Sequence, residues 1–191
     1  MIKVGILGDI GSGKSYVAKQ FGFPVFNADN EVSKIYKKDK KCYIKLKKAV
    51  PKHILSFPIN KMEITKSILS NQKNLKKIIK IVHPIVQLKM NNFIKKNKNK
   101  RIIILDVPLL LESKIDKIID ILVFVEAKKE KIIKNLKKRK NYNIQIIRIL
   151  KKLQLPLNYK KKKSDFIIKN NFRENFVKKN IKLLKNKILN V

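Results

Sequence analysis

The residues best suited to chemistry lie near the N-terminus, in Gly8-Asp9-Ile10-Gly11-Ser12-Gly13-Lys14-Ser15. This segment, here called the phosphate loop, fits the pattern G-x-x-x-x-G-K-[ST] throughout. Glycines allow the backbone angles that turn successive N–H groups inward around a phosphate, and the positive end of the following helix points at the same anion. Lys14 can reach the β- and γ-phosphates, and the Ser15 hydroxyl can bind Mg²⁺. The pattern predicts nucleotide binding.

Two aspartates follow short apolar runs, where the strands of a parallel sheet are expected to end. Asp29 comes after residues 24–26, and Asp106 closes the run 101–106. Because ligands gather at the carboxyl ends of parallel strands, Asp29 can accept the proton of an acceptor hydroxyl or orient that hydroxyl toward the γ-phosphate. Asp106 lies where a carboxylate holds Mg²⁺ through water. The alternatives are a helix N-cap for Asp29 and a turn aspartate for Asp106.

The elements that must position these residues alternate between strands and helices, which indicates an α/β fold with a parallel sheet and helices on both faces. The expected strands are residues 2–7, 24–26, 101–106, 121–125 and 165–168. The expected helices are 15–21, 128–139, 144–154 and 174–189. Residues 31–100 are mostly helical in character, with interruptions at Pro51, Pro58 and Pro84, and Pro156 breaks the pattern after residue 154.

A strong positive charge raises the question of a nucleic-acid partner. The 191 residues carry a formal net charge of +35, but lysines are spread over nearly every segment, and arginine occurs only at positions 101, 139, 148 and 173. Lys, Ile and Asn all have A/T-rich codons, so a biased genome explains the composition, and no aromatic-interleaved basic motif occurs. We expect no dedicated nucleic-acid partner, although polyanions should bind non-specifically at low salt. A nucleic-acid-binding protein whose phosphate loop serves regulation remains the alternative from another class.

The remaining composition bears on the compartment. No apolar run reaches the length of about 18 residues that a transmembrane helix needs. Met1-Ile-Lys-Val4 leads directly into a strand-like segment, without the order of a signal peptide. The single cysteine, Cys42, excludes an internal disulfide and a multi-cysteine zinc site, and it is interpreted as a partly buried spectator thiol. We expect a cytoplasmic protein with no membrane association.

The phosphate loop alone does not identify the reaction, because GTPases, motor ATPases and small-molecule kinases share it. A GTPase would need a guanine-reading N-K-x-D segment, and the sequence contains none. An adenylate kinase would show G-x-P-G-x-G-K, with proline where this chain has Ile10. The short chain and its long helical insertion favour a kinase that phosphorylates a hydroxyl of a small anionic metabolite. A kinase acting on a nucleoside monophosphate or another small acceptor remains the alternative.

One segment narrows the choice of acceptor: Asp106-Val-Pro-Leu-Leu-Leu-Glu112 resembles D-V-P-L-L-[FL]-E, a signature of dephospho-CoA kinases. Further segments resemble motifs of the same family, in the same order and at compatible spacing. They are Gly8 to Ser15 for G-G-I-G-S-G-K-S, Asn27-Ala28-Asp29 for D-A-D, Ile81-Val-His83-Pro84 for I-x-H-P, and Arg139, Gln154 and Asp165 to Asn170 for R…Q…A-D-x-V-I-x-N. The resemblance spans almost the whole chain and is therefore specific.

The resemblance implies transfer of the ATP γ-phosphate to the 3′-hydroxyl of dephospho-CoA. The products are ADP and CoA, in the last step of coenzyme A biosynthesis, with Mg²⁺ as the cofactor. The family has a P-loop NTPase-type three-layer fold, with a parallel sheet of about five strands. On that pattern one domain spans 1–191, with its core at 1–30, 91–135 and 163–191, a helical acceptor-binding insertion at 31–90 and a lid at 136–162.

The resemblance also assigns roles to single residues. The catalytic residues are Lys14, Asp29 and Arg139, whose guanidinium closes on the triphosphate. The ATP-binding residues are Gly8, Gly11, Ser12, Gly13, Lys14, Ser15, Tyr16 and Arg139. The acceptor-binding residues are Asp29, His83, Leu109 and Glu112, and the metal ligands are Ser15 and Asp106. From residue types alone, Arg139 would be a solvated base and His83 a structural hydrogen-bonding group.

Several positions depart from the family pattern. Asp9 replaces a glycine and places a negative charge near the phosphates, which would weaken ATP binding unless Asp9 faces solvent or a lysine. Tyr16 replaces a threonine, and its bulk must find room. Asn27 replaces the first aspartate of D-A-D, which leaves Asp29 as the only carboxylate of that segment. Asn135 stands where an arginine often begins the lid, and neighbouring lysines replace that arginine in charge but not in bidentate geometry.

Overall fold

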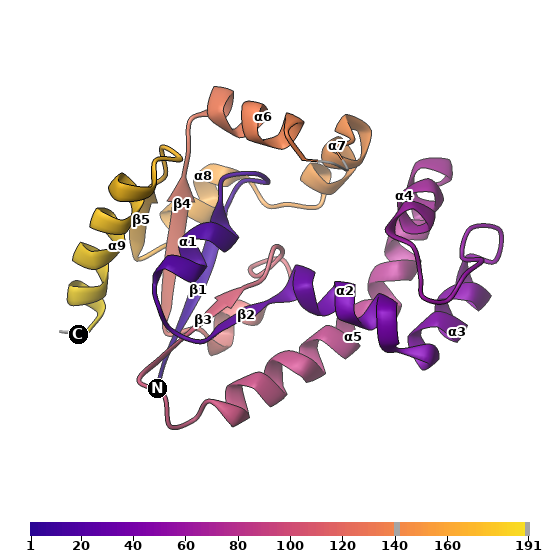
Figure 1. Cartoon of the computed structure of the whole chain (residues 1–191), viewed down its shortest axis with the longest axis horizontal. Coiled ribbons are helices and arrows are strands. Elements are labelled where there is room, and N and C mark those ends of the chain that lie inside the picture. The colour runs from indigo at the N-terminus through magenta and orange to yellow at the C-terminus, as the bar shows by residue number, and fades with distance from the viewer. Residues whose placement is uncertain (140–141, 190–191) are drawn as a thin grey trace. The chain divides into compact units, whose positions relative to one another are not determined.

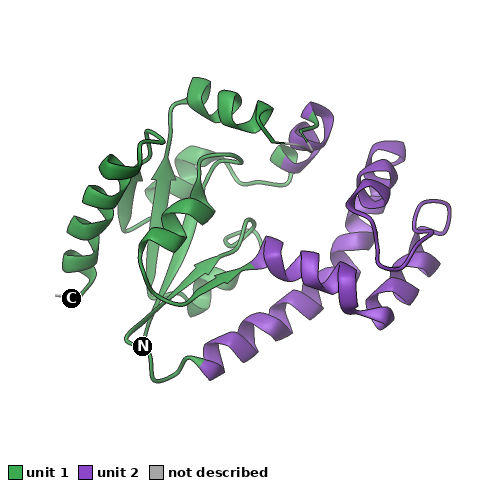
Figure 2. Cartoon of the chain, viewed as in Figure 1, with its two compact units in different colours: residues 1–27, 97–143, 151–191 green, residues 28–96, 144–150 purple. Residues whose placement is uncertain are grey.

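The computed structural model describes residues 1–139 and 142–189. The chain divides into two compact units (Figure 2). Unit 1 comprises residues 1–27, 97–143 and 151–191, and unit 2 comprises residues 28–96 and 144–150. Residues 140–141 of the expected lid and residues 190–191 of the expected core lie outside the described residues.

Unit 1 is built on a sheet whose five described strands all run parallel, in the order β2-β3-β1-β4-β5 (Figure 1). The strands are β1 (Ile2–Gly8), β2 (Val25–Asn27), β3 (Ile102–Asp106), β4 (Ile121–Glu126) and β5 (Phe166–Lys169). Each predicted strand is confirmed to within a residue or two. The runs were recognisable because central strands of a covered parallel sheet are apolar on both faces, and every residue of β3 is buried.

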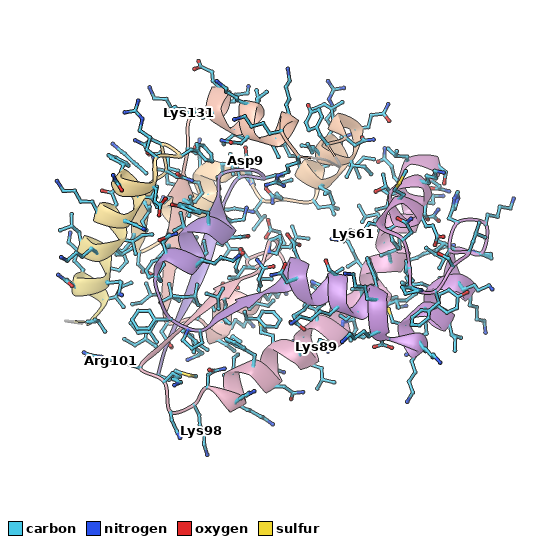
Figure 3. All side chains as sticks on the ribbon, in the orientation of Figure 1. Asp9, Lys61, Lys89, Lys98, Arg101 and Lys131 are labelled. Atoms are coloured by element: carbon cyan, nitrogen blue, oxygen red, sulfur yellow. The ribbon has the colours of Figure 1, made fainter. Side chains whose placement is uncertain are left out.

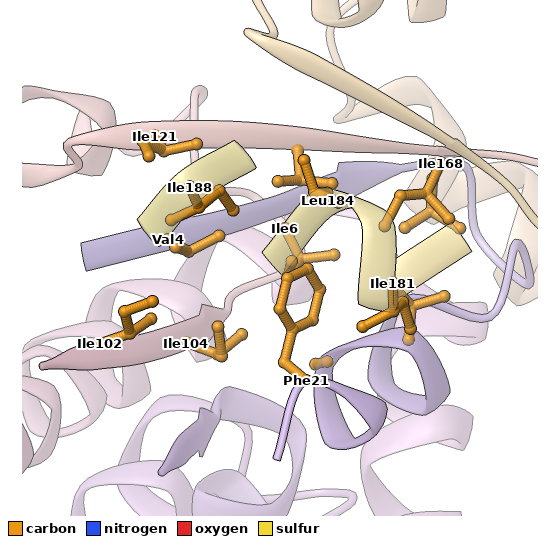
Figure 4. Packing of buried hydrophobic residues seen from close by; sticks show 14 of the residues in the cluster. Val4, Ile6, Phe21, Ile102, Ile104, Ile121, Ile168, Ile181, Leu184 and Ile188 are labelled. Atoms are coloured by element: carbon orange, nitrogen blue, oxygen red, sulfur yellow. The ribbon is translucent and has the colours of Figure 1, made fainter. Parts of the chain in front are cut away.

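Unit 1 also contains helices. They are α1 (Lys14–Gln20), α6 (Lys129–Lys137), α8 (Leu157–Lys162) and α9 (Glu174–Leu189), together with the 3₁₀ turn η1 (Ile115–Ile118). Of these, α1, α8 and α9 pack against the sheet. α1 and α9 pack on one face, where Phe21 points toward Ile6 of β1 and Ile181 of α9 joins the same apolar cluster (Figure 4). α8 packs against β1. This layered α/β architecture confirms the predicted fold class.

Unit 2 is helical. Its helices are α2 (Ala28–Lys38), α3 (Lys40–Ala49), α4 (Lys61–Ser70), α5 (Lys73–Lys96) and most of α7 (Ile144–Lys152). The long helix α5 packs against α2, α3 and α4. Asp39 and Asn60 cap α3 and α4, since their side-chain oxygens accept the backbone N–H groups of Cys42 and Met62. None of the described helices has the length and apolarity needed to cross a bilayer.

Two predictions about prolines need correction. Pro84 was expected to interrupt a helix, but it lies inside α5. Its missing N–H costs one helical hydrogen bond, yet Val82, Val86 and Met90 keep one face of α5 buried, and this packing outweighs the local penalty. The second correction concerns Pro156, which follows the end of α7 but also occupies the N-cap position of the short helix α8, and α8 was not predicted.

Candidate functional site

The phosphate loop connects β1 to α1 at the carboxyl end of the central strand. Gly11 and Gly13 of this loop are required by both backbone angle and space. Gly13 has φ +88°, and a Cβ atom there would lie 2.3 Å from Nδ2 of Asn170. Gly11 has φ +86°, and a Cβ atom there would lie 2.7 Å from Cγ of Leu136 on α6. The loop is therefore closely packed from outside, and a side chain at either position would deform it.

The Lys14 side chain folds back over the phosphate loop. Its Nζ donates to the carbonyl oxygens of Asp9, at 2.8 Å, and Gly8, at 3.2 Å. These bonds hold the ammonium at the mouth of the loop, where a bound phosphate would attract it more strongly than neutral carbonyls do. Ser15, the next residue, is exposed. The predicted phosphate-binding residues thus share one site in unit 1.

Asn170, which directly follows β5, holds the backbone of the phosphate loop through a hydrogen bond. Its Nδ2 donates to the Ser12 carbonyl oxygen at 2.8 Å, and its Oδ1 accepts from the Phe172 N–H at 2.8 Å. The Asn170 side chain is buried, as is Ser12, whose Oγ has no hydrogen-bond partner among the described residues. Sequence reasoning placed Asn170 in a family motif but gave it no role. The structure makes it a residue that fixes the loop's backbone.

Asn27 joins the two predicted metal ligands. Its side-chain Nδ2 donates to Oγ of Ser15 at 3.2 Å and also to Oδ2 of Asp106. Asp106 is buried at the end of β3, directly across from Asn27 at the end of β2. A hydroxyl and a carboxylate in this position suit a hard cation that takes its other ligands from phosphate and water. The described residues contain no cluster of three or more His, Cys, Asp or Glu side chains able to hold a metal by themselves.

Asp9 faces a lysine, one of the two arrangements expected to limit its repulsion of phosphate. Asp9 lies in the loop between β1 and α1 (Figure 3), and its Oδ2 is 3.0 Å from Nζ of Lys151. The other carboxylate oxygen accepts the Ile10 N–H at 2.7 Å. The sequence singled out Asp9 but not Lys151, which is one of many lysines.

Glu112 forms an ion pair that the sequence did not reveal. Its Oε1 accepts from Nζ of Lys160 at 2.7 Å and from the Leu155 N–H at 2.8 Å. The Lys160 side chain is only 1% exposed, although it belongs to a run of four lysines. Oε2 of Glu112 is buried and has no hydrogen-bond partner among the described residues. Glu112 therefore has a structural role through Oε1, and Oε2 takes no part in it.

Two residues assigned to the acceptor lie in unit 2. Asp29 is exposed in the first turn of α2, and its carbonyl oxygen accepts from Oγ of Ser33 at 2.8 Å. The N-cap alternative for Asp29 is wrong, because α2 begins one residue earlier, at Ala28. His83 lies half-buried within α5.

The other assigned residues, and one departure from the family pattern, lie in unit 1. Leu109 is half-buried in the turns after β3, and Arg139 is exposed just beyond α6. Tyr16 is 36% exposed, so its bulk finds room at the surface. Asn135 donates through Nδ2 to the Lys131 carbonyl oxygen at 3.0 Å, one turn earlier on α6.

Solved structures share this architecture. TT1252 from Thermus thermophilus superposes with a TM-score of 0.78 at 22% identity, covering 100% of this chain and 97% of that one. A dephospho-CoA kinase from Campylobacter jejuni superposes with a TM-score of 0.67 at 20% identity, covering 97% and 96%. At such identities the likeness concerns the fold.

Sequence comparison reaches further. The family model for dephospho-CoA kinase matches residues 2–175. A dephospho-CoA kinase from Wolbachia pipientis wMel is 33% identical over 184 residues, which are 94% of each chain. Another, from Wolbachia sp. subsp. Brugia malayi, is 33% identical over 170 residues, or 86% of this chain and 87% of the relative. The chain therefore belongs to the dephospho-CoA kinase family.

Proposed function

We propose that the chain transfers the γ-phosphate of ATP to the 3′-hydroxyl of dephospho-CoA, giving CoA and ADP. Family membership supports this acceptor, and the phosphate loop supports ATP as the donor. The observation that carries the proposal is the joining of Ser15 and Asp106 through Asn27, beside a Lys14 held over the loop. This arrangement supports a site in which an ammonium and two hard oxygen donors contact a bound triphosphate and its cation.

At the donor end, Lys14 supplies most of the electrostatic stabilisation of the transition state. In the transition state negative charge spreads over the oxygens of the transferred phosphoryl group, and an ammonium held beside them stabilises it. The backbone N–H groups of the loop and the N-terminus of α1 add to the same effect. We propose that Arg139 makes a further contact with the triphosphate, since a guanidinium binds phosphate oxygens in a bidentate way. Its exposed position at the end of α6 leaves it accessible to a ligand.

We propose Mg²⁺ as the cofactor, held by Ser15 and, directly or through water, by Asp106. When bound, such an ion would supply positive charge that offsets the negative charge of the phosphates. Asn27 has a separate task, because its amide orients both oxygen donors before any nucleotide arrives. An amide is neutral, so this chain holds its donors with one negative charge fewer than a pair of aspartates would supply.

At the acceptor end, we propose that Asp29 accepts the proton of the 3′-hydroxyl, or orients that hydroxyl for in-line attack. Asp29 is exposed and lies two residues past the end of β2, because α2 begins without an intervening loop. His83, Leu109 and the second oxygen of Glu112 are the proposed acceptor contacts. The segments 31–90 and 136–162 are the proposed acceptor-binding insertion and lid.

A coupled assay of ADP release tests the choice of acceptor. Dephospho-CoA should support turnover far better than AMP, CMP, dTMP or shikimate at equal concentration. Lys14→Ala should remove most turnover, because it loses roughly 3 kcal/mol of transition-state stabilisation. Asp29→Asn should lower kcat and leave the ATP Kd nearly unchanged. ADP release with AMP but not with dephospho-CoA would replace this proposal by a nucleoside monophosphate kinase.

We also propose that the protein acts in the cytoplasm, where ATP is abundant, and that polyanion binding is incidental to its charge of +35. Fractionation of cells that express the chain tests the first point. For the second, affinity for DNA or RNA should fall steeply with added salt and ignore sequence. Binding that resists salt and prefers one sequence would favour a dedicated nucleic-acid function instead.

A further inference from the structure

Lys151 is placed beside the phosphate loop by an ion pair. Its Nζ lies 3.0 Å from Oδ2 of Asp9, and the other oxygen of Asp9 accepts the Ile10 N–H. The Asp9 side chain is 13% exposed, and that of Lys151 is 44% exposed. The carboxylate is thus fixed within the loop, while the ammonium remains accessible from solvent. A ligand in the loop would meet a lysine there that the motif does not contain.

A second set of contacts keeps Lys151 in place without Asp9. The Gln154 N–H donates to the Lys151 carbonyl oxygen at 3.1 Å, and the next residue, Leu155, donates its N–H to Oε1 of Glu112. Glu112 is in turn paired with the buried Lys160. The chain from Lys151 to Leu155 is therefore tied to unit 1 at a point unrelated to the phosphate loop. Loss of the Asp9 contact would leave the Lys151 backbone where it is.

We infer that Lys151 is an ATP-binding residue, held ready by Asp9 and transferred to the γ-phosphate when ATP binds. The inference rests on the proposed function, because it takes ATP as the donor. A terminal phosphate carries more negative charge than one carboxylate and offers more acceptor oxygens, so it competes successfully for the ammonium. Lys151 then supplies a positive charge from within the proposed lid, 136–162. Asn135, which stands in place of an arginine, offers only an amide, and that amide is bonded to Lys131.

A simpler role for Lys151, neutralising the charge of Asp9, would also make its loss weaken ATP binding. If its ammonium only neutralised Asp9, Lys151→Gln would weaken ATP binding by exposing the phosphates to the Asp9 charge. The two roles differ when Asp9 is already neutral. A lysine that contacts phosphate is still needed in an Asp9→Asn background, whereas a lysine that only neutralises Asp9 is not.

The test is a set of dissociation constants for MgATP and MgADP, measured by calorimetry on the full chain. The variants are Asp9→Asn, Lys151→Gln, the double variant, and Lys152→Gln as a matched control on the same helix turn. We expect Lys151→Gln to weaken ATP binding roughly tenfold in both the wild-type and Asp9→Asn backgrounds, the size of one charged hydrogen bond. Asp9→Asn alone should tighten ATP binding, and Lys152→Gln should change it less than about twofold.

Discrimination between nucleotides completes the test. The loss of affinity in Lys151→Gln should be several times smaller for MgADP, which has no γ-phosphate. A Lys151→Gln change with no effect in the Asp9→Asn background would overturn the inference, and so would equal losses for ATP and ADP. Thermal melts of each variant establish that it is folded. Because binding needs no acceptor, failure of the wild type to phosphorylate dephospho-CoA would contradict the proposed function and leave these binding results interpretable.

Discussion

The side-chain amide of Asn27 donates a hydrogen bond to the buried carboxylate of Asp106, across the ends of the neighbouring parallel strands β2 and β3. The same amide also bonds Ser15 of the phosphate loop. One neutral side chain thus orients both oxygen donors that we assign to the cation. The family pattern has an aspartate at this position. Replacing Asn27 by aspartate therefore tests how the negative charges of the site depend on a cation.

Asn27→Asp should make the protein less stable without Mg²⁺ and more responsive to it. Two facing carboxylates repel each other and lose the present hydrogen bond, at a cost of about 1–3 kcal/mol. A divalent cation between them reverses the repulsion. Urea unfolding with and without millimolar MgCl₂ measures both effects, and Asn27→Ala, which removes the bond without adding charge, is the comparison. Equal stability of Asn27→Asp and Asn27→Ala without the ion would contradict the pairing.

Gly13→Ala should abolish ATP binding, because the added methyl group would collide with the Asn170 amide that fixes the loop. Gly22→Ala is the matched control. Gly22 also has a positive φ, +73°, but a Cβ atom there would meet only Nζ of Lys185, at 3.8 Å. Both variants should lose about 1 kcal/mol from backbone strain. Only Gly13→Ala should lose nucleotide affinity, and retention of wild-type affinity in that variant would contradict the loop geometry.

Lys160→Met should lower the free energy of unfolding by about 3–5 kcal/mol, because it leaves Glu112 as a buried charge without its cation. The neighbouring Lys161 forms a surface pair with Glu126. Lys161→Met should therefore cost less than about 1 kcal/mol. Chemical denaturation of both variants measures the difference. Similar small losses in the two would mean that the Glu112–Lys160 pair is solvated.

Cys42 should be inert to thiol reagents in the folded protein near neutral pH. Burial, and then the nearby Asp39 carboxylate, raise the pKa of its thiol to about 11, and the side chain is 0% exposed. Little thiolate is then present below about pH 9, and the labelling rate should rise as the pH approaches 11. Labelling with a chromogenic disulfide at pH 8 should be slow for the folded protein. It should be fast in about 6 M guanidinium, which unfolds the chain and serves as the control. Rapid labelling of the folded chain would contradict this burial.

The sequence was informative where local pattern determines structure. The strands are continuous β-branched runs, and the phosphate loop has a fixed spacing of glycines, so β1, β3 and α1 were predicted closely. Contacts between distant residues left no such trace. Asn170 and Ser12 are 158 positions apart, and Lys151 and Asp9 are 142 apart.

The abundance of lysine prevented the prediction of two ion pairs, Lys160 with Glu112 and Lys151 with Asp9. Lys160 is buried and Lys161 to Lys163 are exposed, yet nothing in the run distinguishes the first from the rest. Pro84 misled for a related reason, because its local preference against helix is overruled by the buried face of α5. The predictions failed where packing between distant segments decides the outcome over local propensity.

The central claim is that this chain phosphorylates the 3′-hydroxyl of dephospho-CoA. The most direct measurement incubates the purified protein with MgATP and dephospho-CoA and identifies the product by mass spectrometry and ³¹P NMR. We expect one added phosphate, located on the ribose 3′-oxygen, in a one-to-one ratio with ADP. ADP formed without phosphorylated dephospho-CoA, or a phosphate on another oxygen, would contradict the account.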